Sequence, residues 1–193
     1  GAGIGGLAVA LALHKAGHTN LKLVERSVSS PPTAAGINLQ PHAVRVLYHL
    51  GIGDKACGVG LPPRHQCYFS SKGELVGLKP AGLATDPDGY PQVSISHRQL
   101  HSLLLDTVAE RLGPDAIVRG LKSSGYSQDD SGVVLQLMDA ESRKPVEPMR
   151  CDILIAADGI YSPLRKTMHP NDGEVARSGL TVFRGVAPFP RFL

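Results

Sequence analysis

The pattern of apolar and polar residues along this chain is typical of helices in some stretches and of strands in others. It predicts the order of the helices and strands. The run LAVALALHK at 7–15 consists of helix formers and small apolar residues, and the AGH that follows ends the predicted helix. LKLVE at 21–25 then alternates in the manner of a strand. A second helix is expected from Pro41 to Leu50, because proline suits a first helical turn and Gly51 supplies a stop.

The middle of the chain changes to strand-like patterns separated by turn formers. HQCYFSS, the turn KGE and LVGL, together 65–78, predict a hairpin, and QVSIS at 92–96 predicts another strand. A helix with one buried face is expected next. Its apolar stripe comprises Leu100, Leu103, Leu104, Val108 and Leu112.

The last third of the chain contains further candidate strands. DAIVR at 115–119 and VVLQLMD at 133–139 have strand-like patterns. CDILIAADG at 151–159 is a continuous apolar run into a turn, which is typical of a buried parallel strand. The alternation of strands and helices predicts an α/β fold, with an antiparallel insertion between Arg64 and Ser96.

Composition and charge narrow the possible partners. The 193 residues are 42% hydrophobic and 19% charged, as in ordinary globular proteins, and the net charge is only +3. The basic residues are scattered, which argues against nucleic acid and anionic membranes as partners. No apolar run reaches the roughly 18 residues of a membrane span. Three widely spaced cysteines indicate a reducing compartment, so the cytoplasm is the expected location.

The first residues, GAGIGG, match the phosphate-binding pattern G-x-G-x-x-G and lead directly into the first predicted helix. Gly1 would permit the turn, Gly3 would let the backbone approach a pyrophosphate, and Gly6 would allow close packing of the helix. Glu25 ends the next strand nineteen residues beyond Gly6, where a carboxylate can accept both ribose hydroxyls of an adenosine. This negative charge argues against a 2′-phosphorylated ligand.

The glycine pattern alone leaves two questions open. It does not separate FAD from NAD, and a glycine-rich turn of this kind can also occur without any ligand. Glu25 could likewise be a solvated acid beside Arg26.

The run CDILIAADGIYSPLR resembles a signature of class A flavoprotein monooxygenases, the para-hydroxybenzoate hydroxylase-like aromatic hydroxylases. The matching residues are Ala157, Asp158, Gly159, Ser162 and Arg165. In that family the motif is linked with both FAD and the reducing nicotinamide nucleotide. The alternative is that Asp158 and Arg165 only hold a loop together.

Two more stretches extend the resemblance. GINLQPHAVRVLYHLGI, from Gly36, is similar to the family segment that crosses near the flavin ring. HRQLHSLLLDTVAERLG is similar to the segment whose arginine, here Arg98, lies near the FAD diphosphate, although Arg98 could also be an exposed first-turn residue. TVFRGVAP, around Arg184 and Gly185, resembles the strand that leads into the substrate domain. The expected cofactor-binding set is Gly1, Gly3, Gly6, Glu25, Arg26, Gly36, Arg98, Asp158 and Gly159.

The resemblance implies a Rossmann-like FAD-binding domain of the glutathione-reductase type with an inserted antiparallel hairpin. By this comparison, residues 1–64 and 97–177 are the two parts of the FAD-binding domain. Residues 65–96 begin the substrate-domain insertion, and 178–193 resume the substrate domain. The family's first strand and its later Gly-Asp signature have no counterpart in these residues, so the chain is expected to be an N-terminal fragment truncated at both ends.

The activity implied by the resemblance is hydroxylation of a small aromatic substrate with NAD(P)H and O₂, through a flavin C4a-hydroperoxide. Phenazine-hydroxylating members are the most alike, and salicylate-type hydroxylases are more distant. FAD performs the chemistry in this family, so no catalytic side chain is expected. No metal site is expected either, because no pair of histidines or cysteines has the spacing of a zinc site. The alternatives are an FAD-dependent reductase or dehydrogenase, and a truncated nucleotide-binding fragment without catalysis.

Overall fold

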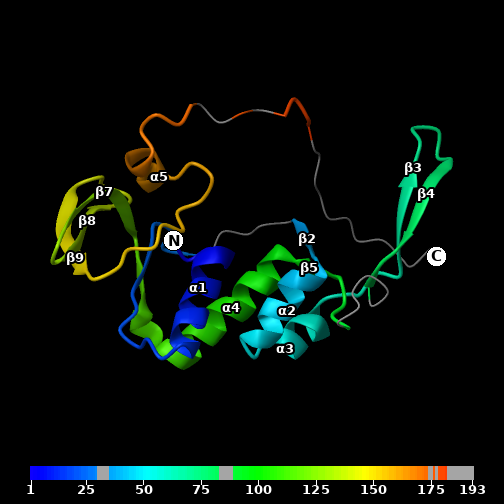
Figure 1. The fold of residues 1–193 in the computed structure, drawn as a ribbon, viewed down its shortest axis with the longest axis horizontal. Coiled ribbons are helices and arrows are strands. Elements are labelled where there is room, and N and C mark those ends of the chain that lie inside the picture. Colours follow the sequence, from blue (N-terminus) through cyan, green and yellow to red (C-terminus); the bar gives the residue numbers. More distant parts are fainter. Residues whose placement is uncertain (30–34, 83–88, 174–175, 177, 182–193) are drawn as a thin grey trace. The chain divides into compact units, whose positions relative to one another are not determined.

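The computed structural model describes residues 1–29, 35–82, 89–173, 176 and 178–181. The chain divides into two compact units (Figure 1). Unit 1 comprises residues 1–31 and 104–182, and unit 2 comprises residues 32–103 and 183–193. Both contain helices and strands, which confirms the predicted α/β class. The predicted TVFRGVAP strand, with Arg184 and Gly185, lies outside the described residues.

Unit 1 begins with helix α1 (Ile4–Lys15), which contacts strand β1 (Leu23–Glu25). The helix starts earlier than the sequence predicted, and Leu7 and Leu11 are fully buried. It ends at Lys15, and Gly17 two residues later has a φ of 96°, which suits glycine. β1 pairs in parallel with β6 (Ile117–Arg119), so both predicted strands are confirmed in shortened form. This strand–helix arrangement is the Rossmann-like element that the sequence predicted.

An antiparallel sheet completes unit 1. It contains β7 (Leu121–Asp129), β8 (Gly132–Asp139) and β9 (Pro145–Cys151). One face of β8 buries Leu135 and Leu137 against Leu164 of helix α5 (Pro163–Met168). Only β8 was predicted, because the frequent polar residues in LKSSGYSQD and PVEPMRC obscure the period-two pattern of its neighbours.

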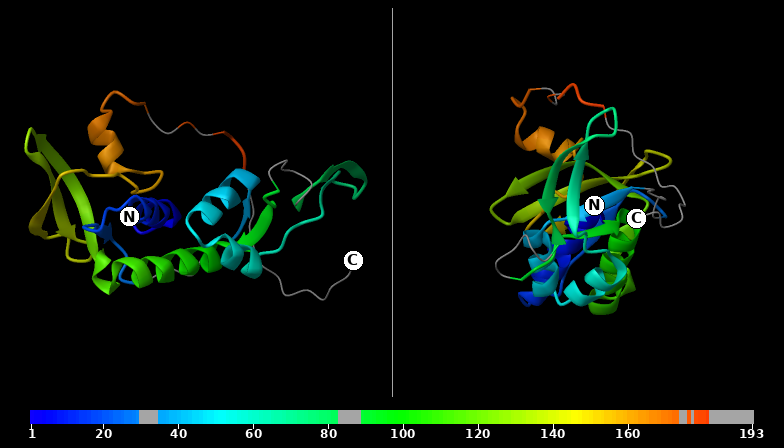
Figure 2. Two further views of the ribbon diagram at one scale, coloured as in Figure 1. Left: turned by 60° about the horizontal axis from the view of Figure 1, so that its bottom comes forward. Right: turned by 90° about the vertical axis from the view of Figure 1, so that its right-hand side faces the viewer.

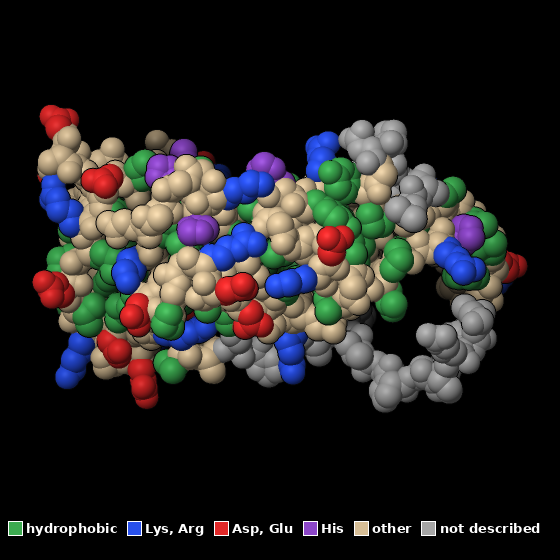
Figure 3. Space-filling view, turned by 90° about the horizontal axis from the view of Figure 1, so that it is seen from below, with side chains coloured by type: hydrophobic (Ala, Val, Ile, Leu, Met, Phe, Trp, Pro, Cys, Tyr) green, Lys and Arg blue, Asp and Glu red, His purple; other side chains and the backbone are tan. Residues whose placement is uncertain are grey.

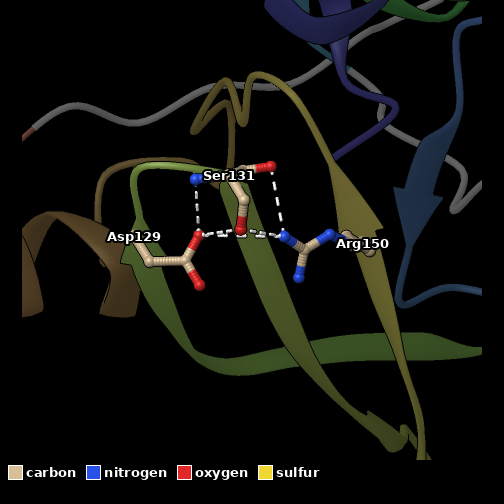
Figure 4. Close-up of polar contacts among 3 residues, drawn as sticks. All are labelled: Asp129, Ser131 and Arg150. Carbon is tan, nitrogen blue, oxygen red and sulfur yellow. Dashed lines mark hydrogen bonds and ion pairs between the residues drawn. The ribbon is translucent and has the colours of Figure 1, made fainter.

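Polar contacts close the β7–β8 turn and join it to β9 (Figure 4). The carboxylate of Asp129 accepts the N–H of Ser131 at 2.8 Å, and Arg150 donates to the Ser131 carbonyl at 3.1 Å. Arg150 also contacts the Ser131 hydroxyl and lies 3.7 Å from the Asp129 carboxylate. All three residues are exposed, so these contacts define the turn more than they stabilise the unit.

The strand predicted at CDILIAADG is wrong. β9 ends at Cys151, and residues 153–159 form no strand. Leu154 packs against the core cluster of Leu135, Leu137 and Leu164, whereas Ile153 and Ile155 are 77% and 47% exposed. Within the described ranges no strand pairs with this segment. A continuous apolar run is therefore not enough to predict a strand, because a sheet strand also needs a neighbour for its backbone groups.

Unit 2 contains the antiparallel pair β2 (Gly36–Leu39) and β5 (Val93–Ser96). Helix α2 (Pro41–His49) confirms the expected helix, and α3 (Gly53–Val59) follows it. α3 was not predicted, because its seven residues include two glycines. Helix α4 (His97–Leu112) confirms the amphipathic prediction, and Leu100, Leu104 and Val108 are fully buried. The division between the units falls within α4, after Leu103.

The predicted hairpin is confirmed as β3 (His65–Phe69) and β4 (Leu75–Pro80). It extends away from α2 and α3 of the same unit (Figures 1 and 2). Its large apolar side chains are exposed, and Val76 reaches 70% and Phe69 62%. Only one of its strand residues, Gly77, is even half-buried, with the Tyr68 ring beside it.

Within the described part of the chain, no helix is long and apolar enough to cross a membrane. Acidic and basic side chains are interspersed on the face shown in Figure 3, in keeping with the small net charge of +3.

Candidate cofactor site

The glycine loop, residues Gly1–Gly6, delivers the chain into the N-terminus of α1. Gly3 is the N-cap in an extended conformation, and no side chain caps the helix. The first amide bonded along the helix is that of Leu7, which donates to the Gly3 carbonyl at 3.0 Å. The preceding N–H groups, of Ile4 to Gly6, thus have no acceptor within the helix. Such amides, together with the helix dipole, bind phosphate groups.

The three glycines of the pattern have different surroundings. A Cβ on Gly6 would lie 1.9 Å from the Gly1 carbonyl oxygen, and one on Gly1 would lie 2.6 Å from that of Ala157. Around Gly3, no atom lies within 4 Å of the corresponding position. Gly1 and Gly6 are therefore required by the packing of the chain itself. The open space at Gly3 fits the predicted close approach of a diphosphate.

The Asp-Gly turn, Asp158–Gly159, is held by the start of α5. Gly159 has a φ of 90°, which a side chain would strain, and the Asp158 carboxylate accepts the N–H of Leu164 at 3.3 Å. Ser162 is the N-cap of α5, and its hydroxyl accepts the N–H of Arg165 at 2.8 Å. The motif residues thus organise the turn that leads into α5, and the contact between Gly1 and Ala157 brings this turn to the glycine loop.

Glu25 joins the glycine loop to the end of β1. Its Oε2 accepts the N–H of Ala2 at 2.8 Å, and its Oε1 accepts the N–H of Ser27 at 2.8 Å. Burial raises the pKa of Glu25, but the backbone N–H groups of Ser27 and Ala2 outweigh it and hold the pKa below its ordinary value. The sequence predicted that Glu25 contacts a ribose, and it did not predict these two bonds. Backbone N–H donors cannot be recognised from a sequence, because nearly every residue type carries one.

The other predicted cofactor-binding residues belong to different units. Arg26 is exposed beside Glu25 in unit 1. Gly36 and Arg98 belong to unit 2, where Gly36 pairs with Ser96, two residues before the exposed Arg98. Each unit therefore brings its own members of the predicted set together. The roles of these residues toward FAD stay predictions.

The lowered pKa of Glu25 predicts an acid-sensitive fold. The ionised carboxylate is favoured in the folded state, so its contribution to the unfolding free energy is complete above the ordinary value of 4.5 and is lost as pH falls through the lower folded pKa. Glu25→Gln should therefore show a smaller loss of stability than the unchanged protein between about pH 6 and pH 3, measured by urea denaturation. Equal losses in both proteins would contradict a stabilising role for the carboxylate.

Known proteins share both the sequence and the fold of this chain. The family model described as "FAD binding domain" matches residues 1–182. Phenazine 1,6-dicarboxylic acid hydroxylase of Lysobacter antibioticus is 33% identical over 193 residues, which are 100% of this chain and 47% of that protein. A salicylate hydroxylase of Pseudomonas putida is 30% identical over 193 residues, covering 96% of this chain and 41% of that protein.

A solved structure carries the cofactor itself. Klebsiella pneumoniae HpxO, complexed with FAD and uric acid, matches 86% of this chain and 40% of its own chain, with a TM-score of 0.73 and 30% identity. The chain thus spans less than half the length of the relatives that it matches. Since the family model covers nearly all of its residues, the chain belongs to the FAD-binding domain family.

Proposed function

We propose that the protein to which this chain belongs is an FAD-dependent monooxygenase. It would use NAD(P)H and O₂ to hydroxylate a small aromatic compound. The observation that carries the proposal is the packing of the glycine loop against the Asp-Gly turn within unit 1, through Gly1, Gly6 and Ala157. The names of the relatives support it, since they include hydroxylases of phenazine 1,6-dicarboxylic acid and salicylate.

We propose a specific task for each part of the site. The amides of Ile4 to Gly6 would bind the FAD diphosphate, and Glu25 and Arg26 would bind its adenosine end. Asp158 and Gly159 would contact FAD beside the glycine loop, and Gly36 and Arg98 remain in the proposed set of FAD-binding residues. When bound, FAD supplies the redox chemistry, so the residues of the chain are needed to bind, orient and shield it from water.

The β3–β4 hairpin would begin the substrate domain, in agreement with the expected division at 65–96. Its exposed apolar side chains support this assignment, because a two-stranded hairpin is only marginally stable alone and needs further packing. We retain residues 1–64 and 97–177 as the two parts of the FAD-binding domain and 178–193 as the return to the substrate domain. The cytoplasm is the proposed location.

The proposal is tested on the full-length protein with an aerobic panel of aromatic acids, phenazines and uric acid. We expect one compound to accelerate both NAD(P)H oxidation and O₂ consumption, and to gain one oxygen atom. Isotopically labelled O₂ identifies the origin of that atom by mass spectrometry. Added catalase returns O₂ from any hydrogen peroxide, and so measures the part of the O₂ consumption that does not hydroxylate the compound. NAD(P)H oxidation without O₂ consumption would instead identify a reductase, and no oxidation with any compound would contradict catalysis.

A further inference from the structure

The carboxylate of Glu25 lies between two segments of the backbone. Both of its oxygens accept backbone N–H groups, one from Ala2 in the glycine loop and one from Ser27 in the segment after β1, each at 2.8 Å. The two donors lie on opposite sides of Glu25 in the sequence. The side chain therefore connects the glycine loop to the segment that follows β1.

These contacts suit a carboxylate and do not suit an amide. An ionised carboxylate has only acceptors, and each oxygen can accept more than one hydrogen bond. A glutamine could accept one of the two N–H groups, but its own NH₂ would face the other. The lowered pKa of Glu25 agrees with a group that is ionised because backbone donors surround it.

The bond to Ala2 acts on the most constrained part of the glycine loop. Ala2 is only 3% exposed, and the Ala157 carbonyl oxygen leaves no room for a side chain on its neighbour Gly1. Gly3, on the other side of Ala2, is the N-cap of α1. Fixing the Ala2 amide thus fixes the direction in which the chain enters the helix, and with it the direction of the first-turn N–H groups.

We infer that Glu25 is a positioning residue that fixes the glycine loop in the conformation that binds the cofactor diphosphate. This role is independent of any contact between Glu25 and the adenosine ribose. The inference rests on the proposed placement of FAD at this loop. It predicts that Glu25 contributes to the affinity for a ligand that has no ribose hydroxyls to offer. A residue that acts only by binding those hydroxyls would contribute nothing to such a ligand.

The test uses the full-length apoprotein and two ligands, FAD and an FAD analogue that lacks both hydroxyls of the adenosine ribose. Dissociation constants are measured by flavin fluorescence for the unchanged protein, for Glu25→Gln and for Glu147→Gln. Glu147 lies exposed on β9, so its substitution makes the same change of charge away from the loop. We expect Glu25→Gln to weaken binding of the analogue about ten- to hundredfold, and Glu147→Gln to leave it unchanged. Equal binding of the analogue by all three proteins would overturn the inference.

A second measurement needs no ligand. In the apoprotein, amide hydrogen exchange at Ala2 and Ser27 should become faster in Glu25→Gln than in Glu147→Gln, while the amides of β8 keep their protection. Unchanged exchange at Ala2 would contradict the positioning role. Failure of the unchanged full-length protein to bind FAD would contradict the proposed function instead, and the exchange experiment would still decide the role of Glu25.

Discussion

Gly6→Ala is expected to abolish FAD binding by the full-length protein and to lower its free energy of unfolding by about 3 kcal/mol. The added Cβ would lie 1.9 Å from the Gly1 carbonyl oxygen, a backbone atom that cannot turn aside as a side chain can. Relief requires the loop to move away from α1. Because Gly1 already contacts Ala157, this movement would also disturb the Asp-Gly turn.

Gly3→Ala provides the matched control in the same loop. No atom lies within 4 Å of its added Cβ, so the folded apoprotein should keep its thermal stability. We expect Gly3→Ala to weaken FAD binding alone, because its methyl group would occupy the open space that we propose for the diphosphate. Thermal unfolding of the apoproteins and fluorescence titration with FAD distinguish the two variants. Equal stability of the Gly6 and Gly3 variants would contradict the packing argument.

The sequence predicted elements whose patterns are local. The glycine loop with α1, the strand ending at Glu25, and the β3–β4 hairpin each carry their signal within a few residues. It missed α3 and β7, since short glycine-containing helices and polar strands show little periodicity. The run at 151–159 failed for another reason. Its apolar pattern is strong, but pairing depends on residues elsewhere in the chain.

The candidate site divides in the same way. The residue types and spacing of Gly1, Gly3, Gly6 and Glu25 follow from the chemistry of phosphate and ribose binding, so they could be selected from the sequence. The contact of Gly1 with Ala157 joins positions far apart in the chain, and only the fold reveals it. The bonds from Ala2 and Ser27 to Glu25 are equally hidden, because every residue except proline carries the same backbone donor.

Leu164 connects the core of unit 1 to the Asp-Gly turn, so Leu164→Ala should affect both. Its side chain is 4% exposed and packs with Leu135 and Leu137, and its N–H donates to Asp158 at 3.3 Å. Removing the buried side chain should cost about 3 kcal/mol of unfolding free energy, through lost apolar contact and the cavity left behind. Urea denaturation of the apoprotein measures this loss.

Met168→Ala is the control on the same helix, since Met168 is 55% exposed and should change stability by about 0.5 kcal/mol or less. The substitution at Leu164 leaves the backbone donor to Asp158 in place. Any fall in FAD affinity must therefore arise because α5 is less firmly packed and no longer holds the turn beside the glycine loop. A stability loss with unchanged FAD affinity would show that the turn keeps its geometry when α5 is loosely packed. The core of unit 1 would then have no role in cofactor binding.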